Sequence, residues 1–360
     1  MDNWFEIENT GTLMSPALLF YGERIEHNIQ KMIEIAGDVK RLRPHIKTHK
    51  CLEIIQLQMK HGINRFKCAT LTEATLLAEC GVKDVLIAYP LVEPMQHHLV
   101  HLTQKYPETR FSVLIDNESH VNAWNTTQHS IDVFIDVNVG MGRTGIAPED
   151  APNLLKIVQE TGYTFRGWHV YDGHIRISNS EEQKKTVEQA FLPISKLLAA
   201  TQTQHLEVIC GGSISFVAHA DAIERTLSPG TTLLWDYGYG IRFPDLPFQN
   251  AAVLLTRIIS KPNNDCLCLD LGHKAVASEM QKAPVYFPQL QDAQIVVHSE
   301  EHLVLQVKDA ANWSIGDVLY GIPYHICPTV ALHSSAALVE NKKAGKFWEI
   351  AARNRQYIHG

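Results

Sequence analysis

The strongest constraint on the fold is the alternation of strand-like and helix-like segments between residues 17 and 240. Amphipathic stretches such as Glu149–Thr161 and Glu181–Ala200 separate apolar runs that are typical of buried strands. The expected strands are Arg41–Lys47, Phe66–Thr70, Asp84–Pro90, Arg110–Asp116, Asp132–Val137, Arg166–Gly173, Leu206–Gly211 and Thr226–Leu234. Eight such units in succession predict an α/β fold, a (β/α)8 TIM barrel, rather than an open sheet.

Beyond Phe248 the pattern changes to short apolar runs without long helices between them. The expected strands there are Ala251–Ser260, Cys266–Leu271, Ile295–Ser299, Leu303–Val307, Asp317–Ile322, Thr329–His333 and Phe347–Ala351. This spacing predicts a second, all-β domain. We therefore expect a barrel over residues 17–245 and a β domain over residues 246–360, which residues 1–16 join.

Charge and composition exclude several classes of partner. The net charge is −7 and no polybasic cluster appears, which argues against nucleic acid and against an anionic membrane surface. No apolar run approaches the ~18 residues that a membrane helix needs. The acidic start, Met1–Glu6, does not resemble a signal peptide, and the seven cysteines suit reduced thiols. The sequence thus predicts a cytoplasmic protein with a small-molecule partner.

The segment Arg43–Lys50 reads Arg-Pro-His-Ile-Lys-Thr-His-Lys and follows a strand-like run. A lysine that forms a Schiff base needs a rigid mount at a strand end, where its amine meets a carbonyl at fixed geometry. Lys47 and Lys50 are both placed for this role. The alternative is a basic loop with two solvated lysines.

Two further strand ends carry unusual residues. The run after Asp132–Val137 contains three glycines around Arg143, and an ordinary β–α turn would explain it equally well. The segment Gly167–Arg176 places alternate side chains on one face of a strand, so that the rings of two residues face the barrel interior. The candidate site residues of this segment are His169, Tyr171, His174 and Arg176. On the loop past the strand, His174 is placed as a general base.

The last two strands of the expected barrel end in turns of small residues, Gly211–Ser213 and Ser228–Thr232. Backbone N–H groups and hydroxyls of such turns form the usual phosphate site of a TIM barrel. Two tight turns without a ligand are the alternative. The candidate phosphate residues are Gly212, Ser213, Ser228, Gly230 and Thr231.

Near the C-terminus, His325 and Cys327 lie two residues apart on a segment that we expect to be extended. Their side chains would then point the same way and hold one metal ion, with an imidazole and a thiolate that suit zinc or a similar divalent ion. A bare His-x-Cys pair is also common without metal.

Together these motifs resemble the D-threonine aldolase and D-serine dehydratase family, relatives of alanine racemase, from Leu18 to Arg355. The resemblance implies that Lys47, rather than Lys50, binds pyridoxal 5′-phosphate. It also implies that Arg143 faces the cofactor or substrate and that His169 and Arg176 lie at the cofactor. Alanine racemase has an arginine at the pyridine nitrogen where this chain has Ser228. A neutral serine at this position would leave the pyridine nitrogen unprotonated. The implied cofactor set is Lys47, Arg143, His169, Tyr171, Arg176, Gly212, Ser213, Ser228, Gly230 and Thr231.

The same resemblance implies a function. We expect a lyase that depends on pyridoxal phosphate and on a divalent metal, zinc or manganese, and that splits D-β-hydroxy amino acids into glycine and an aldehyde. Lys47 and His174 would be catalytic. Dehydration of D-serine or D-3-hydroxyaspartate is the first alternative, because the dehydratase branch carries His-x-Cys where the aldolase branch carries His-x-Asp. An amino acid racemase and a non-catalytic pyridoxal-phosphate carrier are further alternatives. Family members also imply a homodimer.

Overall fold

The computed structural model describes residues 3–125, 131–280 and 283–355, and its contacts divide the chain into two units. The barrel unit is built mainly from Met32–Lys47 and Ile55–Gly230. The β unit is built mainly from Thr48–Ile54 and Thr231–Arg353, together with the segment that ends at Lys31. The expected division between residues 245 and 246 stays a prediction.

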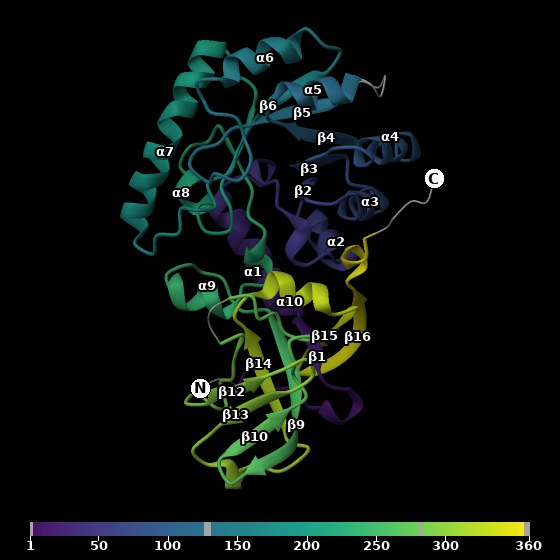
Figure 1. The fold of residues 1–360 in the computed structure, drawn as a ribbon, viewed down its shortest axis with the longest axis vertical. Coiled ribbons are helices and arrows are strands. Elements are labelled where there is room, and N and C mark those ends of the chain that lie inside the picture. The colour runs from purple at the N-terminus through teal and green to yellow at the C-terminus, as the bar shows by residue number, and fades with distance from the viewer. Residues whose placement is uncertain (1–2, 126–130, 281–282, 356–360) are drawn as a thin grey trace. The chain divides into compact units, whose positions relative to one another are not determined.

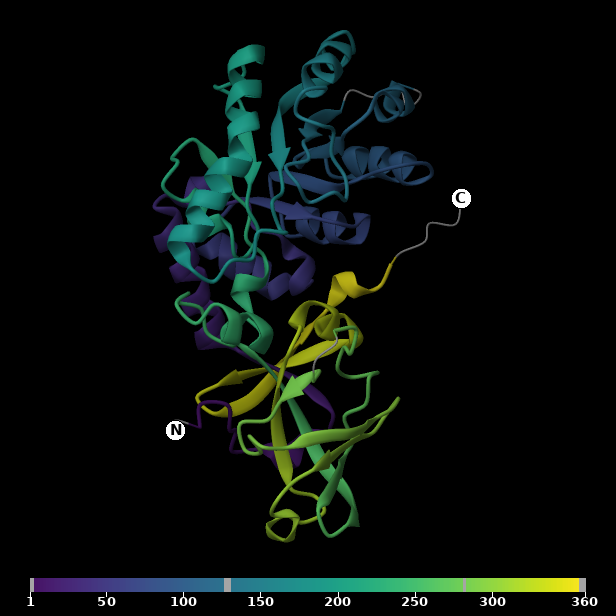
Figure 2. The same ribbon diagram turned by 60° about the vertical axis from the view of Figure 1, so that its left-hand side comes forward.

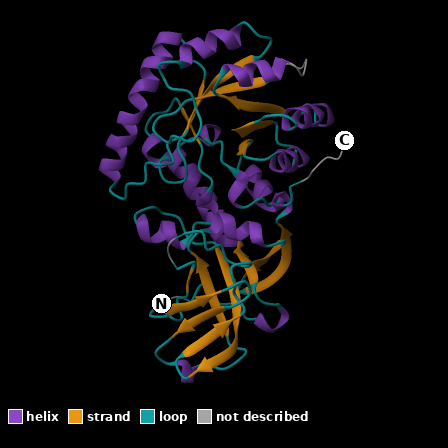
Figure 3. Cartoon of the chain, in the orientation of Figure 1, coloured by secondary structure: helices purple, strands orange, loops and turns teal. Residues whose placement is uncertain are grey.

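The barrel unit contains a parallel sheet of seven strands in the order β2-β3-β4-β5-β6-β7-β8 (Figure 1). The strands are β2 (Arg65–Cys68), β3 (Asp84–Pro90), β4 (Arg110–Ile115), β5 (Asp132–Asp136), β6 (Thr164–Val170), β7 (Glu207–Cys210) and β8 (Arg225–Leu227). The helices are α2 (Leu52–Lys60), α3 (Leu71–Glu79), α4 (Met95–Lys105), α5 (Glu118–Asn125), α6 (Ala151–Gln159), α7 (Ser180–Thr201) and α8 (Phe216–His219). Helices lie outside the orange strands in Figure 3, which confirms the predicted α/β barrel class.

The segment before β2 closes the barrel, but it is not the continuous strand that we expected over Arg41–Lys47. Leu42 bridges to Leu227 of β8, and His45 bridges to Lys67 of β2. Short 3-10 helices, Val39–Arg41 and Ile46–Thr48, take up the two ends. Proline has no N–H for a ladder, so Pro44 allows only isolated bridges here. Lys47 therefore lies in a 3-10 turn rather than at a strand end.

Side chains fill the barrel interior in layers. At the strand starts Arg43 is fully buried and pairs with Asp84 at 2.9 Å and with Glu207 at 3.0 Å. Arg166 also pairs with Asp84, at 2.7 Å. An apolar layer follows, formed by Leu86, Leu114, Phe134 and Ile209. These two layers fill the barrel from the strand starts upward, and a further group of polar side chains lies at the carboxyl ends of the strands, where barrel enzymes hold their sites.

The β unit contains a mixed sheet of nine strands in which the long strand β9 pairs with β1, β10 and β14 (Figure 2). The strands are β1 (Ala17–Tyr21), β9 (Ala252–Asn263), β10 (Cys266–Leu269), β11 (Val285–Tyr286), β12 (Gln294–His298), β13 (Leu303–Gln306), β14 (Val318–Pro323), β15 (Ser335–Glu340) and β16 (Lys343–Glu349). Its helices are α9 (Tyr237–Arg242) and α10 (Ile326–Leu332), and α1 (Gly22–Ala36) follows β1. None of the described helices is long and apolar enough to cross a membrane.

One expected strand of this unit is wrong. Residues Thr329–His333 lie in and just after α10. The first N–H of this helix, at Ile326, donates to Asp236 Oδ2, and the Thr329 hydroxyl donates to the His325 carbonyl one turn back. These bonds satisfy groups at the helix start that a strand would leave to a neighbour. The strand β15, which pairs with β1 and β16, was not expected.

Candidate functional site

The barrel unit holds a cavity of about 540 Å³ at the carboxyl ends of its strands. That volume suits a small organic ligand. Five lining residues, which we name the barrel cluster, carry the chemistry: Lys47, Lys67, Arg143, His169 and Tyr171. Four of these five were expected from the sequence, and Lys67 was not. Thr144 and residues between the end of β3 and the start of α4, among them Pro90 and Met95, also line it.

A chain of hydrogen bonds fixes His169 within the barrel cluster. Its Nδ1 lies 2.7 Å from Asp136 Oδ1, and Thr144 donates to the other carboxylate oxygen of Asp136 at 2.7 Å. Burial lowers the pKa of His169, although the charge of Asp136 opposes this shift. Burial raises the pKa of Asp136, but His169 lowers it, and the net result is a pKa of Asp136 below its usual value. Both pKa shifts fit a neutral imidazole whose Nδ1–H donates a hydrogen bond to the ionised carboxylate of Asp136. His169 Nε2 therefore faces Lys67 Nζ, at 3.4 Å, as an acceptor.

Tyr171 carries two cations near its ring. Arg143 Cζ lies 5.0 Å and Lys67 Nζ lies 5.8 Å from the ring centroid. Arg143 itself is exposed at the cavity. A cationic rim with two ring side chains can receive a planar ligand that carries negative charge.

The two turns of small residues meet as the sequence suggested. The Gly230 N–H donates to Ser213 Oγ at 3.3 Å, and a Cβ at Gly230 would lie only 3.0 Å from the His45 carbonyl oxygen. A Cβ at Gly212 would lie 3.1 Å from the Tyr171 ring. Glycine is thus needed at both turns for close packing.

Two predicted cofactor residues bond to the protein in ways that limit their roles. Gly212 donates its N–H to Ser215 Oγ at 3.0 Å, and Ser215 donates in turn to the buried Asp172. Ser228 is buried and donates its hydroxyl to the Arg43 carbonyl at 2.9 Å. With its proton engaged, Ser228 Oγ can only accept a further hydrogen bond.

Two other predicted residues, His174 and Arg176, are exposed and do not belong to the described lining of the cavity. Arg176 Nε donates to the Gly173 carbonyl at 3.0 Å. The His174 ring lies against Gly140, where a Cβ would come within 2.8 Å of its Nε2. Their roles at the cofactor stay predictions.

In the β unit, Cys327 lies among hydroxyl groups. Its Sγ is 3.2 Å from Thr48 Oγ1 and 3.4 Å from Thr231 Oγ1. Burial raises the pKa of this thiol, but His325 and the two hydroxyls outweigh it and lower the pKa. Thr231, which we expected at the cofactor phosphate, is thus placed beside the thiol. Thr48 is the residue that follows Lys47 in the chain.

His325 precedes α10 and Cys327 lies in its first turn, so the pair is not on the extended segment that we expected. His325 Nδ1 bonds to Glu279. Burial lowers the pKa of His325, but Cys327 and Glu279 together raise it to about 9. With Nδ1 engaged by a carboxylate, Nε2 is the nitrogen left for a metal, the arrangement typical of ligating histidines. In the described part of the chain, no three His, Cys, Asp or Glu side chains gather as a metal centre.

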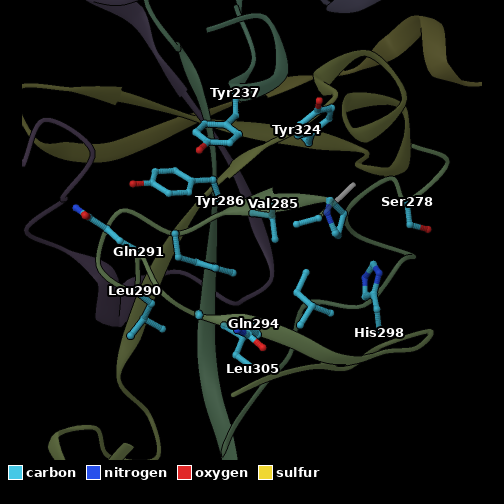
Figure 4. A pocket seen from close by; sticks show the side chains of 15 residues that line it. Tyr237, Ser278, Val285, Tyr286, Leu290, Gln291, Gln294, His298, Leu305 and Tyr324 are labelled. Carbon is cyan, nitrogen blue, oxygen red and sulfur yellow. The ribbon is translucent and has the colours of Figure 1, made fainter. Parts of the chain in front are cut away.

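A second cavity, of about 700 Å³, lies in the β unit. Figure 4 shows Tyr237, Tyr286 and Tyr324 along one of its sides. The first two rings stack, with centroids 4.3 Å apart and planes inclined by 8°. None of the predicted site residues is among its described lining.

Comparison with known proteins identifies the family. Residues 22–237 match the family "Alanine racemase, N-terminal domain", and residues 251–339 match the family "Putative serine dehydratase domain". A D-threonine aldolase of Arthrobacter is 30% identical over 94% of this chain and 92% of its own. The chain belongs to the alanine racemase-like family of fold type III pyridoxal-phosphate enzymes.

Other members support this assignment over the whole chain. A 3-hydroxy-D-aspartate aldolase of Paracoccus denitrificans is 25% identical over 96% of this chain and 93% of its own. The crystal structure of a D-threonine aldolase from Filomicrobium marinum matches with a TM-score of 0.85 and 25% identity, over 95% of this chain and 96% of that one. Both predictions, of the family and of a barrel with a β domain, are confirmed.

Family membership implies pyridoxal 5′-phosphate as the cofactor. The barrel cavity fits this group: it offers a lysine amine, an arginine and two ring side chains. For the implied metal, the imidazole of His325 beside a thiol of lowered pKa is a suitable donor pair.

Lys67, Asp136 and Thr48 were missed as site residues. A lysine inside the apolar run Phe66–Thr70 was the available signal for Lys67, because buried strands rarely carry an unpaired lysine. Asp136 ends an apolar strand in the same way. Nothing in the sequence near Thr48 indicates that it reaches Cys327, far away in the chain.

Proposed function

We propose that this protein is a pyridoxal-phosphate and divalent-metal-dependent lyase that cleaves D-β-hydroxy amino acids to glycine and an aldehyde, like D-threonine aldolase. The observation that carries the proposal is the barrel cluster: a lysine, an arginine and two rings line one cavity. A protein named D-threonine aldolase is similar over nearly the whole chain, which supports the same substrate class.

In this proposal Lys47 would hold the cofactor through its amine. When bound, the cofactor accepts the electron pair that cleavage of the Cα–Cβ bond releases. His169, whose pKa is lowered by burial and whose ring is oriented by Asp136, presents a flat ring toward the cavity. Arg143 supplies a cation for the cofactor or the substrate carboxylate. His174 is the proposed base for the β-hydroxyl proton.

His325 and Cys327 are the proposed metal ligands. A divalent ion lowers the pKa of a hydroxyl group that it binds, which is what cleavage of a β-hydroxy amino acid requires. Thr48 and Thr231 favour the thiolate of Cys327, and Glu279 orients His325. Cys327 is thus favoured as the thiolate that ligates, whereas His325, whose pKa is raised, would release a proton when it binds the ion.

Dehydration is the second candidate function. The thiol of Cys327 and the match to a serine dehydratase domain over residues 251–339 favour it. In this reaction Lys47 would remove the Cα proton and the β-hydroxide would leave, which yields a keto acid after loss of ammonia.

One assay separates the candidates. The protein with pyridoxal phosphate is incubated with D-threonine and with D-serine, each with zinc or manganese. We expect glycine and acetaldehyde from D-threonine. Pyruvate from D-serine without glycine would favour dehydration, and L-allo-threonine from D-threonine or L-serine from D-serine would favour a racemase. A protein that binds the cofactor without any of these products would fit a carrier.

Removal of the metal is expected to stop lysis without unfolding the protein, because the two ligands lie on one short segment. Chelation should leave the absorbance of the bound cofactor unchanged, since Lys47 belongs to the barrel unit. Cys327→Asp should shift the preference from zinc toward manganese, because a carboxylate replaces a soft thiolate. Cys80→Ala, at a half-buried thiol at the end of α3, is the control for Cys327→Ala. Full activity after exhaustive chelation would contradict the metal role.

A homodimer and a cytoplasmic location remain part of the proposal. Sedimentation at micromolar concentration tests the first, and a monomer there would contradict it.

A further inference from the structure

Lys67 is a buried cation with few partners. Only 3% of the residue is exposed, and it lies in the middle of the barrel on β2. Its ammonium group has three donors, but its one side-chain hydrogen bond, at 3.4 Å, goes to His169 Nε2. Among the described residues no carboxylate lies within 4.0 Å of its nitrogen. A charge buried in this way is normally paired.

The surroundings do not supply the missing anion. Asp136 is the nearest candidate, but its oxygens already accept from His169 and Thr144. Lys47 and Arg143 line the same cavity, and the described lining contains no carboxylate. Burial, and then the charge of Lys47, lower the pKa of Lys67 to about 7; Asp136 opposes this, while Arg143 and Arg43 add to it. The lining of the cavity therefore carries excess positive charge.

The lysine also faces a space that a ligand can fill. Lys67 lines the 540 Å³ cavity beside Lys47, and the two segments are joined by the bridge between His45 and Lys67. An anionic group held near the Lys47 amine would thus meet Lys67 as well. A charge-assisted hydrogen bond to such a group would provide the partner that the protein lacks.

We propose that Lys67 binds an anionic oxygen of the ligand in this cavity. This oxygen belongs either to the carboxylate of the amino acid, so that Lys67 makes the site specific for substrates with a free carboxylate, or to the phenolate of the cofactor ring. This inference rests on the proposed function for the nature of the ligand. The observation that Lys67 is buried without an ion-pair partner among the described residues does not depend on the proposed function.

The first experiment uses the protein without cofactor. If Lys67 only supports the fold, its replacement should lower the stability of the protein. If Lys67 serves to bind an anionic ligand, its replacement should raise the stability of the protein without that ligand. We expect Lys67→Met to raise the melting temperature by several degrees, while Lys83→Met, at an exposed pair with Glu108, leaves it unchanged. A fall in the melting temperature of Lys67→Met would overturn the proposal.

The stability difference should depend on pH with a defined sign. The folded pKa of Lys67, about 7, lies below its unfolded value of 10.5, so the unfolded chain binds more protons between the two. The penalty of the wild type relative to Lys67→Met is then largest below pH 7 and shrinks toward pH 10.5. The charged groups that face Lys67 are Lys47, Asp136, Arg143, Arg43 and His169. A difference that grows as the pH rises would contradict the inference.

The second experiment uses the protein loaded with pyridoxal phosphate and separates the two anions. Glycine and ethanolamine differ only in the carboxylate, and the cofactor absorbance reports the binding of each. If Lys67 binds the carboxylate, Lys67→Met should weaken the binding of glycine about 10-fold or more and leave the binding of ethanolamine unchanged. If it binds the phenolate, both amines should behave alike and the pH titration of the cofactor absorbance should shift.

Lys67→Arg, which keeps the positive charge, should bind glycine and titrate the cofactor absorbance much as the wild type does. Wild-type behaviour of Lys67→Met in both measurements would overturn the proposal. Neither experiment requires turnover, so an absence of lysis in the assay above would reject the proposed function and still leave the role of Lys67 decided.

Discussion

Lys47→Ala is expected to lower lysis by about 10³-fold or more, because the proposed reaction depends on the amine that holds the cofactor. Its mount is a 3-10 turn whose Lys47 N–H donates to His45 Nδ1 at 3.2 Å. Borohydride should fix the cofactor to the peptide that contains Lys47, and mass spectrometry of the digest locates it. Activity is measured as glycine released from D-threonine.

The matched control is Lys50→Ala, which should keep both the label and the activity. Lys50 lies in the β unit at a positive φ of 51° and does not line the barrel cavity as described. A label on Lys50 or on Lys67 would contradict the assignment of the nucleophile.

Arg43→Met is expected to cost about 3–5 kcal/mol of the free energy of unfolding, because it leaves the carboxylates of Asp84 and Glu207 without their buried partner. The Arg43 guanidinium donates to Asp84 at 2.9 and 3.0 Å and to Glu207 at 3.1 and 3.0 Å. Arg110→Met, at a half-exposed pair with Asp132 on the neighbouring strand, should cost less than about 1 kcal/mol. Urea unfolding followed by circular dichroism measures both.

The same layer should determine the response to acid. Burial raises the pKa of Asp84, but hydrogen bonds from Arg166 and Arg43 hold it well below its usual range. Its contribution to stability is therefore present above the unfolded pKa of 3.8 and is lost as the pH falls below that value. Arg43→Met should move acid unfolding to a higher pH. An unchanged acid transition would show that Arg166 alone holds Asp84.

Hydrophobic pattern predicted the repeated elements of this fold well. The strand expected over Asp84–Pro90 has those bounds in the structure, since its apolar run is bounded by a charged residue and a proline. Alternation in Gly167–Arg176 correctly brought His169 and Tyr171 to the same cavity. Local pattern is enough in these cases because each residue acts through its own strand.

Contacts between distant segments could not be predicted. Lys67 faces His169 only because the sheet rolls up and the segment around Pro44 closes it. Thr48 meets Cys327 although 279 positions separate them. The helix α10 depends on Asp236, which accepts its first N–H from a different part of the chain. Such tertiary hydrogen bonds override the β-type residues of its sequence.

The closing segment between β8 and β2 has a consequence for local opening. Few main-chain bonds hold it: Arg43 donates to Leu227, His45 to Pro229, and Lys67 to Pro44. The amides of this segment should exchange with deuterium sooner than those of β3 to β6, which are paired on both sides. Local opening should therefore begin in the main chain around the turn that carries Lys47, before the seven-stranded sheet opens.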